Sequence, residues 1–223
     1  MGTARDDKRE AINDLDQTES RLLQERHIYK PFIYPWCYEA WLTQQRVHWL
    51  PEEVPMAEDI RDWKKNLNES EINLMTQIFR FFTQADVEVN NCYMKHYSQV
   101  FGPVEVQMML SAFSNIETVH IAAYSHLLDT LGMPETEYEA FLDYKAMKDK
   151  FDYMQDVSMS SRRDIAKTMA MFGAFTEGLA LFASFAILMN FPRFNKMKGM
   201  GQIITWSVRD ETLHCLSMIK LFN

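Results

Sequence analysis

Two short segments of the sequence share one arrangement of a glutamate and a histidine, Glu117 with His120 and Glu211 with His214. Residues three positions apart lie on one face of a helix, so each pair can present a carboxylate oxygen and an imidazole nitrogen to the same point. A site with oxygen and nitrogen ligands favours iron or manganese over metals that prefer thiolate ligands. Each pair therefore predicts half of a metal site. For either pair alone, the alternative is a core histidine bonded to its own glutamate.

A third acidic residue, Glu177, is the one charged side chain between Thr168 and Met189. This run is long enough to cross a bilayer, but a central acid opposes insertion by roughly 2.5–3.5 kcal/mol. Small residues such as Gly173 and Ala174 also let neighbouring helices approach closely, so we interpret the run as the central helix of a soluble core. Because an unpaired buried carboxylate is costly, Glu177 needs a partner from another helix.

The remaining carboxylate is predicted from the helical pattern over residues 68–101. Asp86 has the apolar residues Phe82 and Val89 one turn away, whereas Glu88 lies on the polar flank of the same segment. Di-metal carboxylate bundles take one carboxylate from each of two helices and a Glu-x-x-His pair from each of two others. Such a set supplies four negative charges, which balance two divalent cations. The sequence therefore predicts a two-metal site with the ligands Asp86, Glu117, His120, Glu177, Glu211 and His214.

Four segments around these residues resemble the metal-ligand motifs of the small, radical-generating (beta) subunit of class I ribonucleotide reductase. The segments are Thr83-Gln84-Ala85-Asp86, Asn115-Ile116-Glu117-Thr118-Val119-His120, Phe175-Thr176-Glu177-Gly178 and Arg209-Asp210-Glu211-Thr212-Leu213-His214. The resemblance extends from about residue 30 to the end of the chain and includes Trp49-Leu50-Pro51-Glu52-Glu53-Val54 upstream. It implies that one metal is held by Asp86, Glu117 and His120. The other metal would be held by Glu177, Glu211 and His214.

The resemblance also implies roles for Tyr124, Trp49 and Asp210. Tyr124 matches the radical-bearing tyrosine and, four residues after His120, lies on the same helix face as the ligands; the alternative is an ordinary core tyrosine with a bonded hydroxyl. Trp49 and Asp210 match the start of an electron-transfer route in which the aspartate links the tryptophan to His120. The alternatives are an aromatic lid for Trp49 and an ordinary salt bridge for Asp210.

An apolar pocket around the radical is a further implication of the resemblance. Phe113, Leu181 and Phe185 would line this pocket and exclude water and reductants. Ser207 stands where a larger apolar side chain is expected.

By this resemblance, two metals react with dioxygen or a related oxidant and oxidise Tyr124 to a stable radical. A large (alpha) subunit would use the radical to reduce ribonucleotides to deoxyribonucleotides. The implied cofactor is a pair of iron ions, with two manganese ions or a mixed pair as alternatives. A homodimer is expected through the 68–101 helix and neighbouring helices. The family continues with further helices and a tail that docks on the large subunit. This chain ends at Asn223, nine residues after His214, so we expect a C-terminally incomplete domain, either as a fragment or as an unusual short form.

Helices must position all of these residues, because the sequence lacks alternating strand patterns with turn dipeptides. Apolar periodicity and caps predict helices over residues 68–101, 104–131, 135–153, 162–190 and from 201 onward, the third being short and exposed. Helices this long are typical of bundles. The predicted fold is all-α, a ferritin-like four-helix bundle core with additional helices. It occupies residues 29–223 after a polar arm over residues 1–28, and the aromatic segment 29–49 covers one side of the bundle.

Composition narrows the function further. The net charge is −8 and no basic stripe compensates for it, which argues against direct nucleic-acid binding. The three cysteines, Cys37, Cys92 and Cys215, lie far apart, which argues against a disulfide framework and favours a reducing compartment. The charged N-terminal segment has no apolar region typical of a secretory signal. We therefore expect a cytoplasmic protein with no membrane association.

Two alternative functions remain from the residues alone. Another di-metal enzyme on the same scaffold, an oxidase, oxygenase or ferroxidase, would carry the same ligand set without a stable tyrosyl radical. The second alternative is a metal-free helical bundle that acts as a structural or interaction protein and retains no metal.

Overall fold

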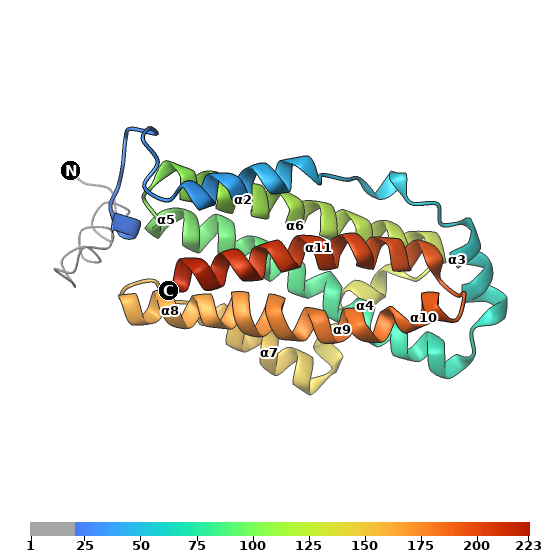
Figure 1. Cartoon of the computed structure of the whole chain (residues 1–223). Helices are drawn as coiled ribbons and strands as arrows, with labels where there is room; N and C mark the ends of the chain where they lie inside the picture. Colours follow the sequence, from blue (N-terminus) through green and yellow to red (C-terminus); the bar gives the residue numbers. More distant parts are fainter. Residues whose placement is uncertain (1–20) are drawn as a thin grey trace.

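The computed structural model describes residues 21–223, and four long helical rods lie side by side in it (Figure 1). Among these residues no strand is present, which confirms the predicted all-α class. The first rod is α4 (Glu69–Asn91) continued by η4 (Cys92–Tyr97) and α5 (Ser98–Val100), and the second is α6 (Val104–Leu131). The third is α8 (Arg162–Met169), η7 (Ala170–Leu181) and α9 (Phe182–Leu188), followed by α10 (Asn190–Arg193), and the fourth is α11 (Lys198–Phe222).

The second and third rods run in the same direction, so a long crossover must join them (Figure 1). One such crossover is the connectivity of ferritin-like bundles. It carries η5 (Glu135–Tyr138), η6 (Ala140–Asp143) and α7 (Lys145–Gln155). The single helix predicted over residues 135–153 is therefore wrong in its first half, which forms two short turns. Tyr138 contacts Ser125 of α6 and Glu137 pairs with Arg80 of α4, so the first half of this segment is tied to two rods of the bundle.

Local signals place the ends of the first two rods. Asn68 caps α4, because its side chain accepts a hydrogen bond from the Glu71 amide while the Glu71 carboxylate accepts one from the Asn68 amide, each over 2.9 Å. Gly132 ends α6 in the left-handed conformation with φ 74°, which glycine adopts without steric cost. Both boundaries agree with the helix ends predicted from the sequence.

The start of α11 is fixed by a distant segment. Asp59 of α3 (Ala57–Arg61) is fully buried, and its carboxylate accepts hydrogen bonds from the Gly199 and Met200 amides, each over 2.8 Å. Asp62, which begins η3 (Asp62–Asn66), accepts a bond from the Met197 amide over 2.8 Å. These carboxylates satisfy amides that a helix N-terminus leaves without intrahelical partners. The helix therefore begins at Lys198, three residues before the predicted start.

The aromatic segment covers α6, as predicted. Its helix α2 (Pro35–Arg46) packs along α6 (Figure 1), and the turn η2 (Pro51–Glu53) follows it. Residues 1–20 of the predicted polar arm lie outside the described residues. In the remainder of that arm, η1 (Arg21–Leu23) packs against the bundle, with Leu23 buried and the Leu22 carbonyl accepting a hydrogen bond from the Gly102 amide.

Two hydrophobic clusters fill the bundle, one toward each end. One contains Tyr124, Phe82 and Phe185, and the other contains Phe113 and Tyr93. The helical stretch Arg162–Arg193 is long and apolar enough to cross a membrane by length and composition alone. Its acidic residue, however, is buried against the other rods, and η7 packs on α11. This arrangement is that of a core helix in a bundle.

Candidate metal centre

The six predicted ligands meet between the two hydrophobic clusters. All are at most 1% exposed, and each of the four rods contributes at least one of them. They are Asp86 from α4, Glu117 and His120 from α6, Glu177 from η7, and Glu211 and His214 from α11. The convergence expected from the sequence is therefore present in the structure.

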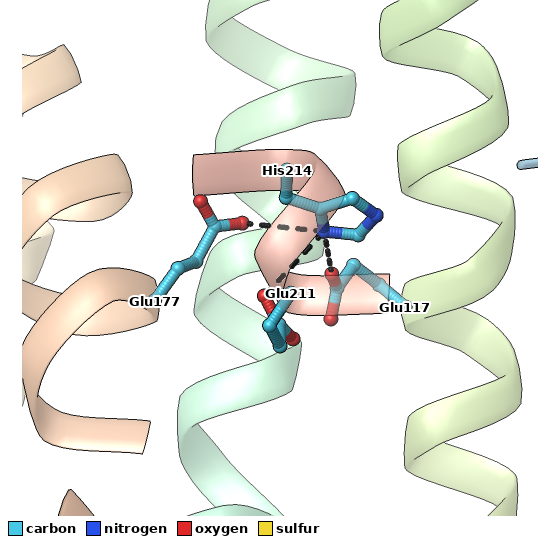
Figure 2. Close-up of side chains that lie close together, drawn as sticks. All are labelled: Glu117, Glu177, Glu211 and His214. Carbon is cyan, nitrogen blue, oxygen red and sulfur yellow. Dashed lines mark ion pairs between the residues drawn. The ribbon is translucent and has the colours of Figure 1, made fainter. Parts of the chain in front are cut away.

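Three carboxylates surround one nitrogen of His214 (Figure 2). Its Nδ1 lies 3.1 Å from Glu117 Oε1, 3.5 Å from Glu211 Oε2 and 3.8 Å from Glu177 Oε1. One candidate ligand atom from each of these four residues lies within 4.8 Å of all the others. This spacing is compact enough for one ion to reach all four side chains.

A second group of the same kind lies around His120. Its Nδ1 is 3.4 Å from Glu117 Oε2 and 3.3 Å from Glu211 Oε1, and ligand atoms of Asp86, Glu117 and His120 also lie within 4.8 Å of one another. Glu117 and Glu211 therefore each direct one oxygen toward each histidine. This is the arrangement that a carboxylate needs in order to lie between two cations.

Hydrogen bonding within the described part of the chain leaves this cluster unsatisfied. Both carboxylate oxygens of Glu117 and one oxygen each of Asp86, Glu177 and Glu211 are buried without a hydrogen-bond partner, as is His214 Nδ1. The close approaches of these carboxylates to the imidazoles are ion-pair contacts, at 3.1–3.8 Å. Buried charged groups without partners are costly. A pair of cations would satisfy these atoms at once, so the residues present fit a di-metal group.

The pKa values of the carboxylates in the cluster are shifted by burial and by the neighbouring charges. Burial, with Glu117 nearby, holds the pKa of Asp86 well above its ordinary value, and burial raises that of Glu177 to about 7. Burial would also raise the pKa of Glu117, but His120 and His214 outweigh it and lower that pKa to about 2. Without cations, the pocket accommodates its carboxylates by retaining protons on some of them.

Contacts behind each imidazole set its orientation. His120 Nε2 lies 3.3 Å from Asp210 Oδ2, and His214 Nε2 lies 3.3 Å from Gln44 Oε1. Since both partners accept hydrogen bonds through these oxygens, each Nε2 donates a proton to its partner, and Nδ1 is the nitrogen that faces the centre. Gln44 also donates to Asp210 Oδ1 over 3.2 Å. Gln44 was not predicted from the sequence, because no local pattern indicates that this polar residue of the aromatic segment is buried.

Trp49 and Asp210 are in contact, as the resemblance implies. Trp49 Nε1 donates to Asp210 Oδ2 over 2.8 Å, and the same oxygen faces His120. Arg209 also pairs with Asp210, through the other oxygen. The Trp49 ring lies 5.0 Å from that of Trp206. An unbroken series of contacts therefore leads from an imidazole of the cluster to Trp49.

Tyr124 lies on the His120 side of the cluster, 2% exposed. Its hydroxyl donates to Ser207 Oγ over 3.1 Å, so the serine provides a hydrogen-bond acceptor in an otherwise apolar pocket. Burial and then Asp86 raise the pKa of Tyr124, which keeps it a neutral phenol. Its ring packs on Phe82, with centroids 4.6 Å apart, and Phe82 packs on Phe185.

Phe113, expected beside Tyr124, packs instead on His214, with ring centroids 4.2 Å apart. Phe113 and Tyr124 are eleven positions apart on α6, about 16 Å along the axis at 1.5 Å per residue. They therefore flank opposite ends of the cluster. Phe82 lines the Tyr124 side and was missed as a pocket residue, although its place one turn before Asp86 could have indicated it.

The sequence is similar to proteins of a known family. The sequence profile of the family described as "Ribonucleotide reductase, small chain" matches residues 26–223. The chain belongs to this family. It is 48% identical over 216 residues to the "Probable ribonucleoside-diphosphate reductase small subunit 376L" of Invertebrate iridescent virus 6, covering 91% of this chain and 60% of that protein. It is 30% identical over 209 residues to the ribonucleoside-diphosphate reductase subunit beta of Chlamydia pneumoniae, covering 86% of this chain and 60% of that protein.

Solved structures share the fold of this small-chain family member. The ribonucleotide reductase R2 subunit from Clostridium botulinum superposes with a TM-score of 0.79 at 19% identity, covering 93% of this chain and 68% of that one. An R2-like ligand-binding oxidase from Sulfolobus acidocaldarius superposes with a TM-score of 0.66 at 20% identity, covering 87% and 77%. These matches confirm the ferritin-like fold. The chain spans about 60% of the length of the curated relatives it matches.

Proposed function

We propose that this chain holds two divalent metal ions and generates a tyrosyl radical as the small subunit of a ribonucleoside-diphosphate reductase. The observation that carries the proposal is a set of buried carboxylate oxygens that converge from four helices on two imidazole nitrogens. Among the described residues, most of these oxygens have no hydrogen-bond partner. Family membership supplies the reaction. The partner would be the large, catalytic subunit, which uses the radical to make deoxyribonucleotides. A homodimer and a cytoplasmic location belong to the same proposal.

In this proposal, Asp86 and His120 hold one metal and Glu177 and His214 hold the other. Glu117 would complete the first set and Glu211 the second, and each of these carboxylates faces both histidines. The metals are two iron ions, or alternatively two manganese ions or one of each, because the ligands are oxygen and nitrogen atoms. When bound, the pair supplies an oxidising centre, with dioxygen as oxidant, strong enough to remove an electron from a nearby phenol.

Tyr124 is the phenol that this proposal uses. As a neutral phenol it must release a proton together with its electron, and Ser207 Oγ fixes the direction of its O–H bond. Phe82, Phe185 and Leu181 belong to the buried cluster around it and keep water from the ring. Asp210 holds His120 in the tautomer that leaves Nδ1 free, and connects it to Trp49. Trp49 is the first residue of the proposed electron-transfer route toward the partner subunit.

Metal analysis and electron paramagnetic resonance test the proposal. The metal-free chain is loaded anaerobically with Fe(II) or Mn(II), desalted and analysed for bound metal, then exposed to air. We expect two ions per chain and a tyrosyl radical signal in the metal form that the protein uses. Tyr124→Phe is the matched variant, because it removes only the hydroxyl: it should retain both metals and lose the signal.

Other outcomes identify the alternatives. A chain that retains neither metal refutes the di-metal centre and favours a structural bundle. A radical that persists in Tyr124→Phe refutes the assignment of that residue. Bound metal that is oxidised in air without any radical in the wild-type chain favours an oxidase or ferroxidase on the same scaffold.

A further inference from the structure

Tyr93 is a second buried tyrosine in contact with the cluster, on the side away from Tyr124. Its hydroxyl donates to Glu177 Oε1 over 2.8 Å, and its ring meets that of His214 edge-on, with centroids 6.1 Å apart. The side chain is 2% exposed. Neither the ligand motifs nor the route through Trp49 accounts for this residue.

The backbone at both ends of this hydrogen bond departs from an ordinary α-helix. Tyr93 lies in η4 and Glu177 in η7, and both segments are π-helical. A π turn admits an extra residue and reorients the side chains it carries, and such turns are frequent at functional sites. The contact between Tyr93 and Glu177 is therefore formed where each helix is locally remodelled.

The hydrogen bond leaves the two oxygens of Glu177 in different situations. Oε1 is held by Tyr93, whereas Oε2 is buried with no hydrogen-bond partner in the described part of the chain. The hydroxyl thus holds Oε1, the oxygen that faces His214 Nδ1 over 3.8 Å, and fixes the carboxylate in that orientation. Near His120, by contrast, the carboxylates of Glu117 and Asp86 receive no hydrogen bond from a tyrosine among the described residues.

Tyr93 also forms part of the wall of a cavity that opens between α2, η4 and α6. The cavity has a volume of about 740 Å³ and is partly polar, with Ser98, Gln107, Ser111 and Ser114 among its lining residues. The same side chain therefore lines this cavity on one side and contacts Glu177 on the other. Removal of its ring would leave a space the size of a phenol between solvent and the cluster.

We propose that Tyr93 is a positioning residue that fixes the orientation of Glu177 for the metal bound at His214. When the Tyr93 side chain is removed, the cavity gives phenol-sized molecules access to the position of its ring. The inference rests on the proposed di-metal centre. Loss of the Tyr93 hydroxyl weakens one of the two metal sites and leaves the other unchanged. A residue important only for folding would weaken both sites or neither.

Manganese titration followed by electron paramagnetic resonance of free Mn(II) tests the first part. We expect Tyr93→Phe to weaken one of two sites about tenfold, the lower range for loss of a group that orients a metal ligand. Tyr97→Phe is the matched control, because Tyr97 is buried in the same segment but donates to the Thr168 carbonyl. The control should bind both ions as the wild type does. Equal weakening of both sites in Tyr93→Phe, or binding like that of the control, would overturn the proposal.

Chemical rescue tests the cavity. In Tyr93→Ala, added phenol should restore the weakened site, while benzene, which fills the same space without a hydroxyl, should not. Rescue by neither compound, or equal rescue by both, would overturn this part of the proposal. If the variant does not fold, Tyr93→Phe still decides the positioning role. A wild-type chain that fails to bind two ions refutes the di-metal proposal itself, whereas two wild-type sites unaffected by Tyr93→Phe refute the role of Tyr93 alone.

Discussion

Replacement of Asp59 by alanine should destabilise the metal-free protein strongly, because this carboxylate caps the start of α11 from a distant part of the chain. It is fully buried and accepts hydrogen bonds from the Gly199 and Met200 amides, each over 2.8 Å. Alanine would leave two buried amides at a helix N-terminus without an acceptor. Each such loss costs about 1–3 kcal/mol, and the helix dipole adds about 0.3–1 kcal/mol.

Burial opposes this stabilisation, since it raises the pKa of Asp59 despite the two amide bonds. Removing the carboxylate recovers that desolvation cost, so we expect a net loss of about 3 kcal/mol, toward the lower end of the summed range. For a chain of this length, the loss corresponds to a fall in melting temperature of roughly 6–12 °C. Asp59→Asn retains one acceptor oxygen and should lose about half as much.

Urea unfolding of the metal-free protein, followed by circular dichroism, measures the effect. Glu58→Ala is the matched control, because Glu58 belongs to the same short helix and pairs with Lys198 at the same end of α11. That ion pair is about half exposed and 3.4 Å long, so its loss should cost under about 1 kcal/mol. If Asp59→Ala unfolds at the same urea concentration as Glu58→Ala, tertiary capping does not stabilise α11 and the reasoning is wrong.

Three further predictions concern a helix cap, proton uptake and thiol reactivity. Ser161→Ala should lower stability by about 1 kcal/mol, because the Ser161 side chain accepts a hydrogen bond from the Asp164 amide at the start of α8; an unchanged melting temperature would contradict this. Burial raises the pKa of Glu177 from 4.5 to about 7, so across this interval the folded metal-free chain binds a proton that the unfolded chain has lost. Its stability should therefore fall as pH rises from about 4.5 to 7, and Glu177→Gln should lessen the fall in urea unfolding at stepped pH; parallel curves for the two proteins would refute the assignment. Burial also raises the pKa of the Cys37 thiol to about 12 and that of Cys92 well above its ordinary value, and Cys215 is buried as well. Ellman's reagent at pH 8 should therefore label three thiols per chain rapidly in urea but only slowly in the native state, and rapid labelling of native protein would show that a thiol is accessible.

The sequence alone predicted the six residues that converge in the structure, because its signals are local. A glutamate and a histidine three residues apart share a helix face wherever the helix lies, and a single acid in an apolar run requires a partner. Asn68 and Gly132 likewise act within a few residues of themselves, so the ends of α4 and α6 were predicted correctly. Such signals identify which side chains must be satisfied, and here they identified all six members of the cluster.

The tertiary structure decided which distant groups complete the centre and which group caps α11. Gln44 contacts a histidine 170 residues away, Tyr93 contacts a glutamate 84 residues away, and Asp59 caps a helix that begins 139 positions later. No periodicity links such pairs, because their contacts arise from the packing of one rod against another. The shared orientation of Glu117 and Glu211 toward both histidines has the same origin, since only the relative placement of α6 and α11 brings each carboxylate between two imidazoles.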